Sequence, residues 1–313
     1  MDTLKVLVTG GAGFIGSNVV DALLKAGHAV VVLDNLSTGR KEHLSDGVEF
    51  YQADLVTDDL TAILKRESPQ VVIHHAAQIS VPLSMDNPVF DAKVNVLGTL
   101  RLLEACSEAG VEKLIYASAS SAAIYGNPEY LPVDEQHPIR PISPYGASKY
   151  TPELYIRLWA ETSGLRYTIL RYANVYGMRQ DPKGEGGVVS VFVDALLSGR
   201  RPVIFGDGEQ TRDFIFVKDV AAANVAALTR GDGGTFNISR CERVSINQLL
   251  HTMGQVLGRP VEADYGPPRP GDILHSSLAN QAARKGLGWE PQYTLEAGLA
   301  ETFAYYQPQY GMR

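Results

Sequence analysis

A tyrosine and a lysine four residues apart, Tyr145 and Lys149, stand in the stretch SPYGASKY at residues 143–150. Residues at i and i+4 share one face of a helix, so the two side chains are expected to project together. Ser143 is a favourable N-cap and Pro144 suits the first helical position, which places the helix start just before the tyrosine. A lysine ammonium favours the phenolate form of a neighbouring tyrosine. Such a tyrosine can take a proton from an alcohol while hydride leaves the carbon.

The same pair is also common on protein surfaces without any catalytic role, so its surroundings decide between the two interpretations. The serine-rich stretch ASASSAAIYG at residues 117–126 ends the expected strand before the pair. Ser120 and Ser121 can hydrogen-bond the substrate oxygen that the tyrosine would deprotonate. Together with the nucleotide motif at the N-terminus, this context favours an acid–base site.

That motif is a glycine-rich turn. VLVTGGAGFIGS at residues 6–17 places Gly10, Gly13 and Gly16 between an expected strand and an expected helix. Glycines let the backbone approach a pyrophosphate, and the helix N-terminus offers free N–H groups and the positive end of a dipole. A glycine triplet alone is a weak signal, but its position after the first strand predicts a dinucleotide site.

An acidic residue, Asp34, ends the second expected strand. A carboxylate there can accept hydrogen bonds from the adenosine ribose hydroxyls and would repel a 2′-phosphate. Arg40 and Lys41 follow only some residues later, so NAD is expected rather than NADP. Asp54 ends the third expected strand, where it either meets the adenine or is an ordinary surface acid.

The elements that must position these residues alternate between strands and helices. Unbroken apolar runs predict strands at residues 5–10, 29–34, 48–55, 71–77, 113–119 and 166–177, and helical patterns such as residues 14–28 separate them. Continuous apolar strands joined by helices indicate a parallel sheet covered on both faces. The expected fold class is therefore α/β, a doubly wound parallel sheet (Rossmann-like) with a smaller C-terminal lobe.

The character of the chain changes after residue 177, where GMRQDPKGEGG begins a charged, glycine-rich loop. We expect a first domain at residues 1–177 and a smaller lobe at residues 178–313. The stretch DFIFVKDVAAANVAALT makes this boundary soft, and residues of about 213–240 are expected to return to the first domain.

Bulk composition excludes several classes of protein. The chain has 313 residues, 45% of them apolar, and a net charge of −7, which is unlike the basic surface of a nucleic-acid binder. Cys106 and Cys241 lack metal-ligand spacing, and His74 and His75 would point to opposite faces of a strand, so no metal site is expected. No apolar stretch near the N-terminus suits a signal peptide or a membrane span. A cytoplasmic protein without membrane partners is expected.

The motif TGGAGFIG, the serine-rich strand end and Tyr145-x-x-x-Lys149 together resemble the extended short-chain dehydrogenase/reductase family of nucleotide-sugar enzymes. The resemblance covers nearly the whole chain. Within that family, NPEYLPVDEQHPIRPISPYGASK at residues 127–149 is most similar to the 4-epimerases that interconvert UDP-galactose and UDP-glucose. The resemblance implies NAD as cofactor, a UDP-sugar substrate and a homodimer. It also implies that residues 178–313 mainly bind the nucleotide sugar.

One local contrast separates relatives within the family. The 4,6-dehydratases carry an Asp-Glu pair just before the VYG-type motif, and UDP-glucuronate decarboxylases carry a glutamate there. Residues 121–126 of this chain read SAAIYG and hold no acid. Oxidation and re-reduction at sugar carbon 4 is therefore the expected chemistry.

The resemblance also implies a role for each catalytic residue. Tyr145 is the base toward the sugar 4-hydroxyl, Ser121 positions that proton, and Lys149 tunes the tyrosine and holds the nicotinamide ribose. Hydride passes to bound NAD⁺, the 4-keto sugar turns over, and hydride returns to its opposite face. The NAD-binding positions implied are Gly10, Gly13, Phe14, Ile15, Gly16, Asp34, Asn35, Ser37, Thr38, Gly39, Asp54, Leu55, Ala76, Ala77, Gln78, Asn95, Tyr145, Lys149 and Tyr172.

The substrate positions follow from the same resemblance. Arginines can give charge-assisted bonds to the diphosphate, although each arginine also fits an ordinary surface salt bridge. Ser276 stands where relatives carry a tyrosine or a small residue, and its small side chain predicts room for an N-acetyl group, hence activity on UDP-GlcNAc and UDP-GalNAc. The implied substrate-binding positions are Ser120, Ser121, Tyr145, Asn174, Val188, Arg212, Arg269, Asp272 and Ser276.

Alternatives remain open at this point. AAQISVPLSMDNP at residues 76–88 also resembles UDP-GlcNAc and UDP-glucuronate epimerases, and Arg179 is a candidate partner for a sugar carboxylate. A non-catalytic dinucleotide sensor is a more remote alternative, because such a protein is expected to lose the Tyr/Lys pair or the arginines. Pro152 falls within the helix begun at Ser143 and is expected to kink it. The resemblance implies that this helix takes part in dimerisation.

Overall fold

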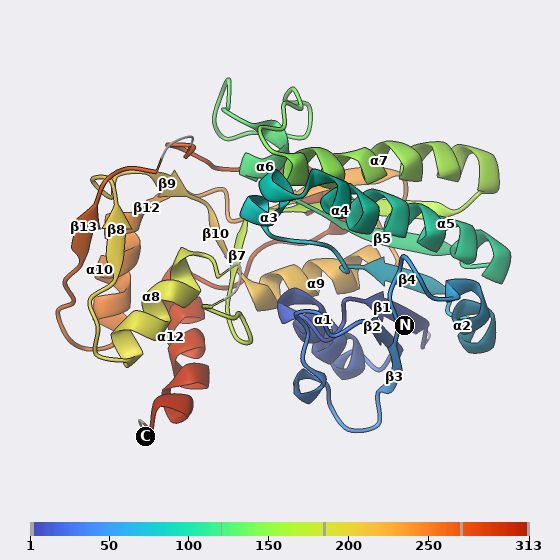
Figure 1. Cartoon of the computed structure of the whole chain (residues 1–313), viewed down its shortest axis with the longest axis horizontal. Coiled ribbons are helices and arrows are strands. Elements are labelled where there is room, and N and C mark those ends of the chain that lie inside the picture. Colours follow the sequence, from blue (N-terminus) through green and yellow to red (C-terminus); the bar gives the residue numbers. More distant parts are fainter. Residues whose placement is uncertain (1–2, 120, 184–185, 270–271, 312–313) are drawn as a thin grey trace.

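The computed structural model describes residues 3–119, 121–183, 186–269 and 272–311, with only the backbone of residues 121 and 122. Within these residues, seven parallel strands form the central sheet, and Figure 1 shows helices on both of its faces. The strands, in their order across the sheet, are β11 (Gly234–Ile238), β6 (Arg166–Tyr172), β5 (Lys113–Ser118), β4 (Val71–His74), β1 (Lys5–Thr9), β2 (Ala29–Asp34) and β3 (Glu49–Gln52). Strand order reverses between β1 and β4, as in a doubly wound fold, so the expected fold class is confirmed.

The sheet is buried on both faces because its strands present apolar side chains alternately to each side. Val6 and Val8 of β1 pack into one apolar cluster, and Leu7 between them packs into the other. The first cluster is closed by α1 (Phe14–Lys25), α9 (Val217–Ala227) and α11 (Gln281–Leu287), and the second by α2 (Leu60–Glu67), α5 (Gly98–Ala109) and α7 (Pro144–Ser163). This double cover explains why the strands read as unbroken apolar runs.

Shorter helices connect these elements. They are η1 (Lys41–His43), α3 (Val81–Asp86), α4 (Pro88–Ala92), the π-helix η2 (Lys93–Leu97) and α6 (Ser121–Tyr125). In Figure 1, α3, α4 and α5 lie alongside α7 in the upper part of the view. This side of the molecule carries the Tyr145 helix.

A smaller lobe, on the left in Figure 1, is built mostly from the second half of the chain. Its apolar core packs α8, α10 and α12 against short strands. Its elements are β7 (Asn174–Tyr176), α8 (Val188–Leu197), β8 (Val203–Phe205), β9 (Thr211–Arg212), β10 (Phe214–Phe216), β12 (Val244–Ser245), α10 (Ile246–Val256), β13 (Asp264–Gly266), α12 (Leu295–Tyr306) and η3 (Gln307–Tyr310). The strands pair as β7 with β10, β9 with β12 and β8 with β13.

One local expectation was wrong. The expected strand at residues 166–177 is divided, because β6 pairs with β5 and β11 whereas β7 pairs with β10 outside the central sheet. Pro152 lies within α7, which runs from Pro144 to Ser163, and the expected kink there stays a prediction. A proline removes one backbone hydrogen bond, and buried residues on both sides of Pro152, among them Lys149 and Ile156, hold this 20-residue helix on the sheet.

Candidate active site

The helix that carries the Tyr/Lys pair starts where its capping residues predict. Ser143 Oγ accepts a hydrogen bond from the Gly146 N–H at 3.1 Å, and Pro144 follows at the first helical position. A Cβ atom on Gly146 would lie 1.9 Å from the Ala123 carbonyl oxygen. Only glycine permits this approach, which packs the first turn of α7 against α6. The Tyr145 segment and the serine-rich segment are thereby brought together.

Lys149 is buried beneath this first turn, with 4% of its surface exposed. Its Nζ donates a hydrogen bond to the Ala117 carbonyl at 2.7 Å and lies 4.6 Å from the centroid of the Tyr116 ring. Burial lowers the pKa of Lys149 to about 7, while the carboxylates of Glu153 and Asp91 oppose this fall. The residue is therefore poised to change charge near neutral pH.

The two serines can be placed only in part. Ser120 lies outside the described residues, and Ser121 begins α6, with its side chain undescribed. α6 follows β5 directly and contains no acidic residue. The backbone alone thus places Ser121 on the element that packs against the start of α7.

The glycine turn is shaped by close backbone approach. Gly10 has φ of +67°, in the left-handed region that favours glycine, and a Cβ on Gly16 would lie 2.1 Å from the Gly10 carbonyl oxygen. The turn leads into α1 and lies at the switch point of the sheet, between β1 and β4. This is the position where doubly wound folds bind dinucleotides.

Asp34, at the end of β2, is buried beside the glycine turn. Its Oδ2 accepts a hydrogen bond from the Ala12 N–H at 3.0 Å, and its Oδ1 accepts one from the Leu36 N–H at 2.8 Å. A Cβ on Gly39 would lie 2.8 Å from Asp34 Oδ1, so the loop after β2 folds closely over the carboxylate. Glycine turn, helix N-terminus and strand-end carboxylate together fit NAD.

The other expected NAD positions gather at one edge of the sheet, because each follows the carboxyl end of a parallel strand. Asn35 Nδ2 donates a hydrogen bond to Asp54 Oδ2 at 2.8 Å, joining the ends of β2 and β3. The positions are Phe14 and Ile15 after β1, Ser37 and Thr38 after β2, Leu55 after β3, Ala76, Ala77 and Gln78 after β4, and Tyr172 at the end of β6.

A buried polar network, which the sequence did not reveal in full, lies beside Lys149. Asn95 in η2 donates hydrogen bonds to Ser148 Oγ at 2.9 Å and to Asp91 Oδ1 at 3.2 Å. Gln78 Nε2 donates to the same carboxylate oxygen at 2.7 Å, whereas Asp91 Oδ2 is buried without a hydrogen-bond partner in the structure. Sequence reasoning found Asn95 and Gln78 but missed Asp91, whose only signal is a charge on an otherwise apolar short helix.

The two adjacent histidines have separate structural partners. His74 Nδ1 lies 2.7 Å from Thr9 Oγ1, and its Nε2 lies 3.0 Å from Thr99 Oγ1. His75 Nε2 lies 3.0 Å from the Tyr172 hydroxyl. Burial lowers the pKa of His75 to about 3, with a smaller contribution from the charge of Lys149. No cluster of three potential metal ligands occurs among the described residues.

On the lobe side, two of the expected substrate residues meet. Arg212 and Asp272 form an ion pair of 2.7 Å, although they lie 60 positions apart in the chain. The Arg269 guanidinium lies 4.2 Å from the centroid of the Phe205 ring. Asn174 begins β7, and its N–H donates to the Asp213 carbonyl at 2.8 Å. Val188 is the first residue of α8.

Ser276 is held in place by its backbone, which donates a hydrogen bond to the Thr211 carbonyl at 3.1 Å. Ser276 is 4% exposed. It lines a cavity of about 10 Å³ together with Tyr125, Gly126 and Pro128. That volume is about what one water molecule needs.

Arg179 is engaged elsewhere. Its guanidinium forms a 2.7 Å ion pair with Asp21 on α1, on the side of the glycine turn.

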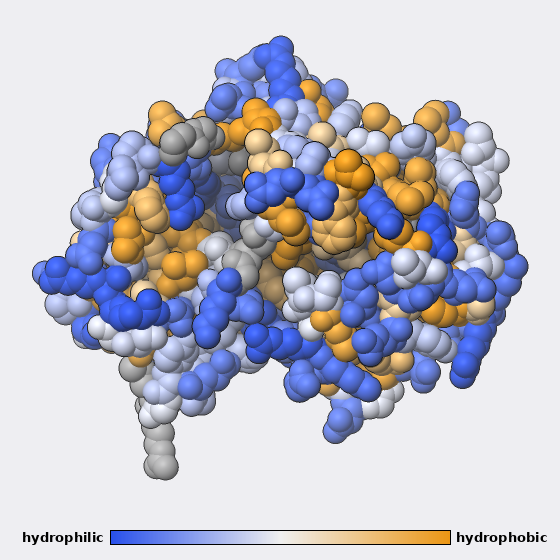
Figure 2. All heavy atoms as spheres, viewed as in Figure 1, coloured by the Kyte–Doolittle hydropathy of each residue, from blue (hydrophilic) through white to orange (hydrophobic). Residues whose placement is uncertain are grey.

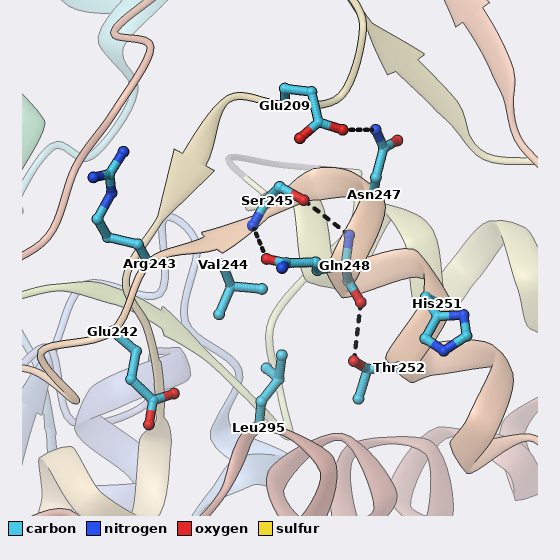
Figure 3. A pocket seen from close by; sticks show the side chains of 10 residues that line it. All are labelled: Glu209, Glu242, Arg243, Val244, Ser245, Asn247, Gln248, His251, Thr252 and Leu295. Atoms are coloured by element: carbon cyan, nitrogen blue, oxygen red, sulfur yellow. Dashed lines mark hydrogen bonds between the residues drawn. The ribbon is translucent and has the colours of Figure 1, made fainter.

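A larger open hollow of about 840 Å³, shown in Figure 3, lies between α10, β12 and the start of α12. Arg243, Gln248 and His251 line it, and none of the residues that line it belongs to the expected site.

The chain belongs to the NAD dependent epimerase/dehydratase family, whose model matches residues 6–239. It is 47% identical to the UDP-glucose 4-epimerase of Mycolicibacterium smegmatis over 97% of this chain and 99% of that protein. The Thermotoga maritima UDP-glucose 4-epimerase, solved with UDP-glucose, is similar with a TM-score of 0.94, 45% identity and coverage of 98% of this chain and 99% of that one.

A third relative carries another substrate in its name. The UDP-N-acetylglucosamine 4-epimerase of Methanobrevibacter ruminantium, in complex with UDP-N-acetylmuramic acid, has a TM-score of 0.93 and 37% identity over 99% of this chain and 100% of that one. The expected family and its NAD dependence are confirmed. Among the described residues, no helix combines the length and apolar character needed to cross a membrane.

Proposed function

We propose that the protein is an NAD-dependent 4-epimerase that interconverts UDP-galactose and UDP-glucose. One observation carries the proposal. Helix α7, which carries Tyr145 and the buried Lys149, packs against α6, and α6 contains no acidic residue. Both helices begin at the carboxyl ends of the strands of a dinucleotide-binding sheet. The family match and the relatives named as 4-epimerases support the same reaction.

The side chains divide the work. Tyr145 removes the proton from the sugar 4-hydroxyl and returns it after the sugar has turned over, and Ser121 hydrogen-bonds the same oxygen. Lys149, when protonated, stabilises the phenolate form of Tyr145 by its charge. NAD, when bound, supplies the acceptor and donor of hydride. No carboxylate of α6 is available for elimination, which separates this chemistry from dehydration.

We further propose that the lobe formed mainly by residues 178–313 binds the UDP moiety. Arg212 and Arg269 are cations in a chain of net charge −7, so they are suited to neutralise the diphosphate. Asp272 is held beside Arg212 by their ion pair and can accept a hydrogen bond from the uridine ribose.

A homodimer is proposed on separate grounds. α3, α4, η2 and α7 are neighbours in the fold and expose large apolar side chains, and Figure 2 shows hydrophobic residues gathered where Figure 1 places α3 and α4. The exposed residues are Val81, Leu83, Met85, Val89, Phe90, Leu97, Leu154, Tyr155 and Leu158. Such a patch is typical of an interface between subunits. Size-exclusion chromatography with light scattering tests it, and a monomer at micromolar concentration would contradict it.

We also propose a cytoplasmic location. Both cysteines, Cys106 and Cys241, are free thiols in the structure. Free thiols suit a reducing compartment. Fractionation of cells that make the tagged protein tests this proposal.

The reaction is tested by incubating purified protein separately with UDP-galactose, UDP-GalNAc and UDP-glucuronate, without added reductant, and separating the products by chromatography. Conversion of UDP-galactose to UDP-glucose supports the proposal. Turnover of UDP-glucuronate alone would favour a hexuronate 4-epimerase instead. Bound NAD without turnover of any of these sugars would favour a dinucleotide sensor.

A further inference from the structure

Glu153 is a fully buried carboxylate one helical turn beyond Lys149 on α7. Arg171 on β6 binds it with two parallel hydrogen bonds, Nε to Oε1 at 2.9 Å and a terminal nitrogen to Oε2 at 2.6 Å. Arg171 is itself 3% exposed. A bidentate buried pair of this kind holds both side chains in one geometry. Neither residue was singled out by the sequence motifs.

The pair reaches both segments that form the site. Ser118, the last residue of β5, donates a hydrogen bond from Oγ to Glu153 Oε1 at 2.7 Å. Arg171 donates another from its second terminal nitrogen to the Tyr125 hydroxyl, at the end of α6, at 2.7 Å. Since α6 starts at Ser121 and α7 carries Tyr145, this single cluster fixes the two segments relative to each other.

The pair also acts on Lys149 through charge. Burial disfavours the ammonium, and the Glu153 carboxylate makes the larger of the two opposing contributions to the pKa of Lys149. The other titratable side chains near Lys149 or Tyr116 are Asp91 on α4, Tyr145 on α7, and His74 and His75 on and after β4. Burial lowers the pKa of both histidines, whereas Glu153 and Asp91 are the two groups whose charge raises the pKa of Lys149.

We propose that Glu153, pinned by Arg171, is a positioning residue of the epimerase that fixes α7 against β5 and α6 and keeps Lys149 an ammonium. The inference rests on the proposed function, because the ammonium matters through Tyr145. Arg171 gives the carboxylate a fixed place, so that its charge acts on Lys149 from one geometry.

The first test is Glu153→Gln, which preserves shape while removing the charge. The alkaline limb of the kcat/KM profile for UDP-galactose should move toward lower pH by about one unit, since losing an opposite charge lowers a lysine pKa by that order. Above the limb this corresponds to a loss of about tenfold. Arg157→Met is the matched control. Arg157 contacts the same carboxylate at 3.1 Å from a more exposed position, and its substitution leaves the charge of Glu153 intact. Its profile should stay in place.

A double variant separates positioning by charge from simple folding. Glu153→Gln with Arg171→Met removes both members of the buried pair, so it should recover part of the thermal stability that the single variant loses. The limb should nevertheless stay displaced. If activity and profile return to wild type together with stability, the pair is only structural and the proposal fails.

A readout without turnover distinguishes this inference from the proposed function. The free energy of unfolding rises with pH wherever the unfolded state binds more protons than the folded state. For Lys149 this rise begins at the pKa of the folded state, above which only the unfolded protein keeps the proton. Glu153→Gln should start this rise at a lower pH, and the difference should vanish in a Lys149→Met background. An unchanged onset would overturn the inference. If Glu153→Gln displaces the onset but the wild-type protein converts no UDP-galactose, only the proposed function is contradicted.

Discussion

Lys149 Nζ on α7 lies 4.6 Å from the centroid of the Tyr116 ring on β5, and both residues are buried. The ring face offers a weak attraction to the cation, but it also excludes the water that would hydrate it. The pKa of Lys149 therefore falls to about 7 through burial. A group placed in this way reduces the stability of the fold whenever it must be charged.

Lys149→Met should therefore stabilise the fold while abolishing activity. Below pH 7 the wild-type lysine is charged in both states and its burial penalty is fully present. Between a pH of about 7 and the ordinary lysine pKa of 10.5, the unfolded state binds more protons and wild-type stability rises with pH. The advantage of the variant should be on the order of a few kcal/mol at about pH 6 and should shrink by about pH 9. Urea unfolding at both values checks this, and an advantage that grows with pH would contradict it.

Tyr145→Phe tests the base directly. Removing one hydroxyl should lower kcat by about 10²–10⁴-fold, the usual contribution of a positioned proton-transfer group. The fold should persist, since the ring continues to pack against the buried cluster. Circular dichroism and measurement of bound NAD provide the controls. Near-wild-type turnover would remove Tyr145 from the mechanism.

Gly16→Ala should prevent NAD binding because of steric overlap. A Cβ at this position would lie 2.1 Å from the Gly10 carbonyl oxygen, so the glycine turn must open. Gly13→Ala is the graded comparison, because its Cβ would lie 3.2 Å from the same oxygen. Bound NAD, measured after release from the purified protein, should decrease far more for Gly16→Ala. Equal losses would mean that the close approach of these two backbones does not matter.

Arg212→Met should raise the KM for UDP-galactose by roughly tenfold to a hundredfold, the range for losing a hydrogen bond to a charged group. kcat should change less, because the residue is expected to hold the diphosphate and not the reacting carbon. Arg284→Met serves as the matched control, since Arg284 pairs with Glu290 at 2.9 Å in an exposed ion pair. If both variants behave alike, the Arg212–Asp272 pair is an ordinary salt bridge.

Ser276→Tyr probes the choice of sugar. Ser276 lines a cavity of about 10 Å³, and its small side chain is expected to leave room for an N-acetyl group. A tyrosine there should remove turnover of UDP-GalNAc while leaving UDP-galactose within about tenfold of wild type. Parallel rates on the two sugars check this. Equal loss on both would show that the position does not discriminate between them.

Local signals explain which parts were predictable from sequence. Ser143 and Pro144 predict the start of α7, and the glycine turn after β1 predicts the start of α1. Both signals are local, because capping and close backbone approach depend on neighbouring residues. Alternating strand and helix patterns were sufficient for the doubly wound sheet. These are features that a few consecutive residues determine.

Long-range pairing explains what the sequence did not show. Glu153 and Arg171 are 18 positions apart, and neither reads as buried until β6 is placed beside α7. Likewise, residues 166–177 look like one strand, but β7 leaves the sheet because its partner β10 comes some 40 positions later in the chain.

The central sheet is completed late in the chain, and this has a consequence for how the protein is made. β11, at its edge, and α9, which covers one face, both come after the chain has passed through α8 and β8 of the lobe. During synthesis, the edge of β6 and the apolar face beneath α9 therefore stay uncovered until residues up to Ile238 have emerged from the ribosome. A nascent chain stopped at residue 177 should be held in an aggregation-prone state, and the NAD-binding half should not mature separately from the lobe.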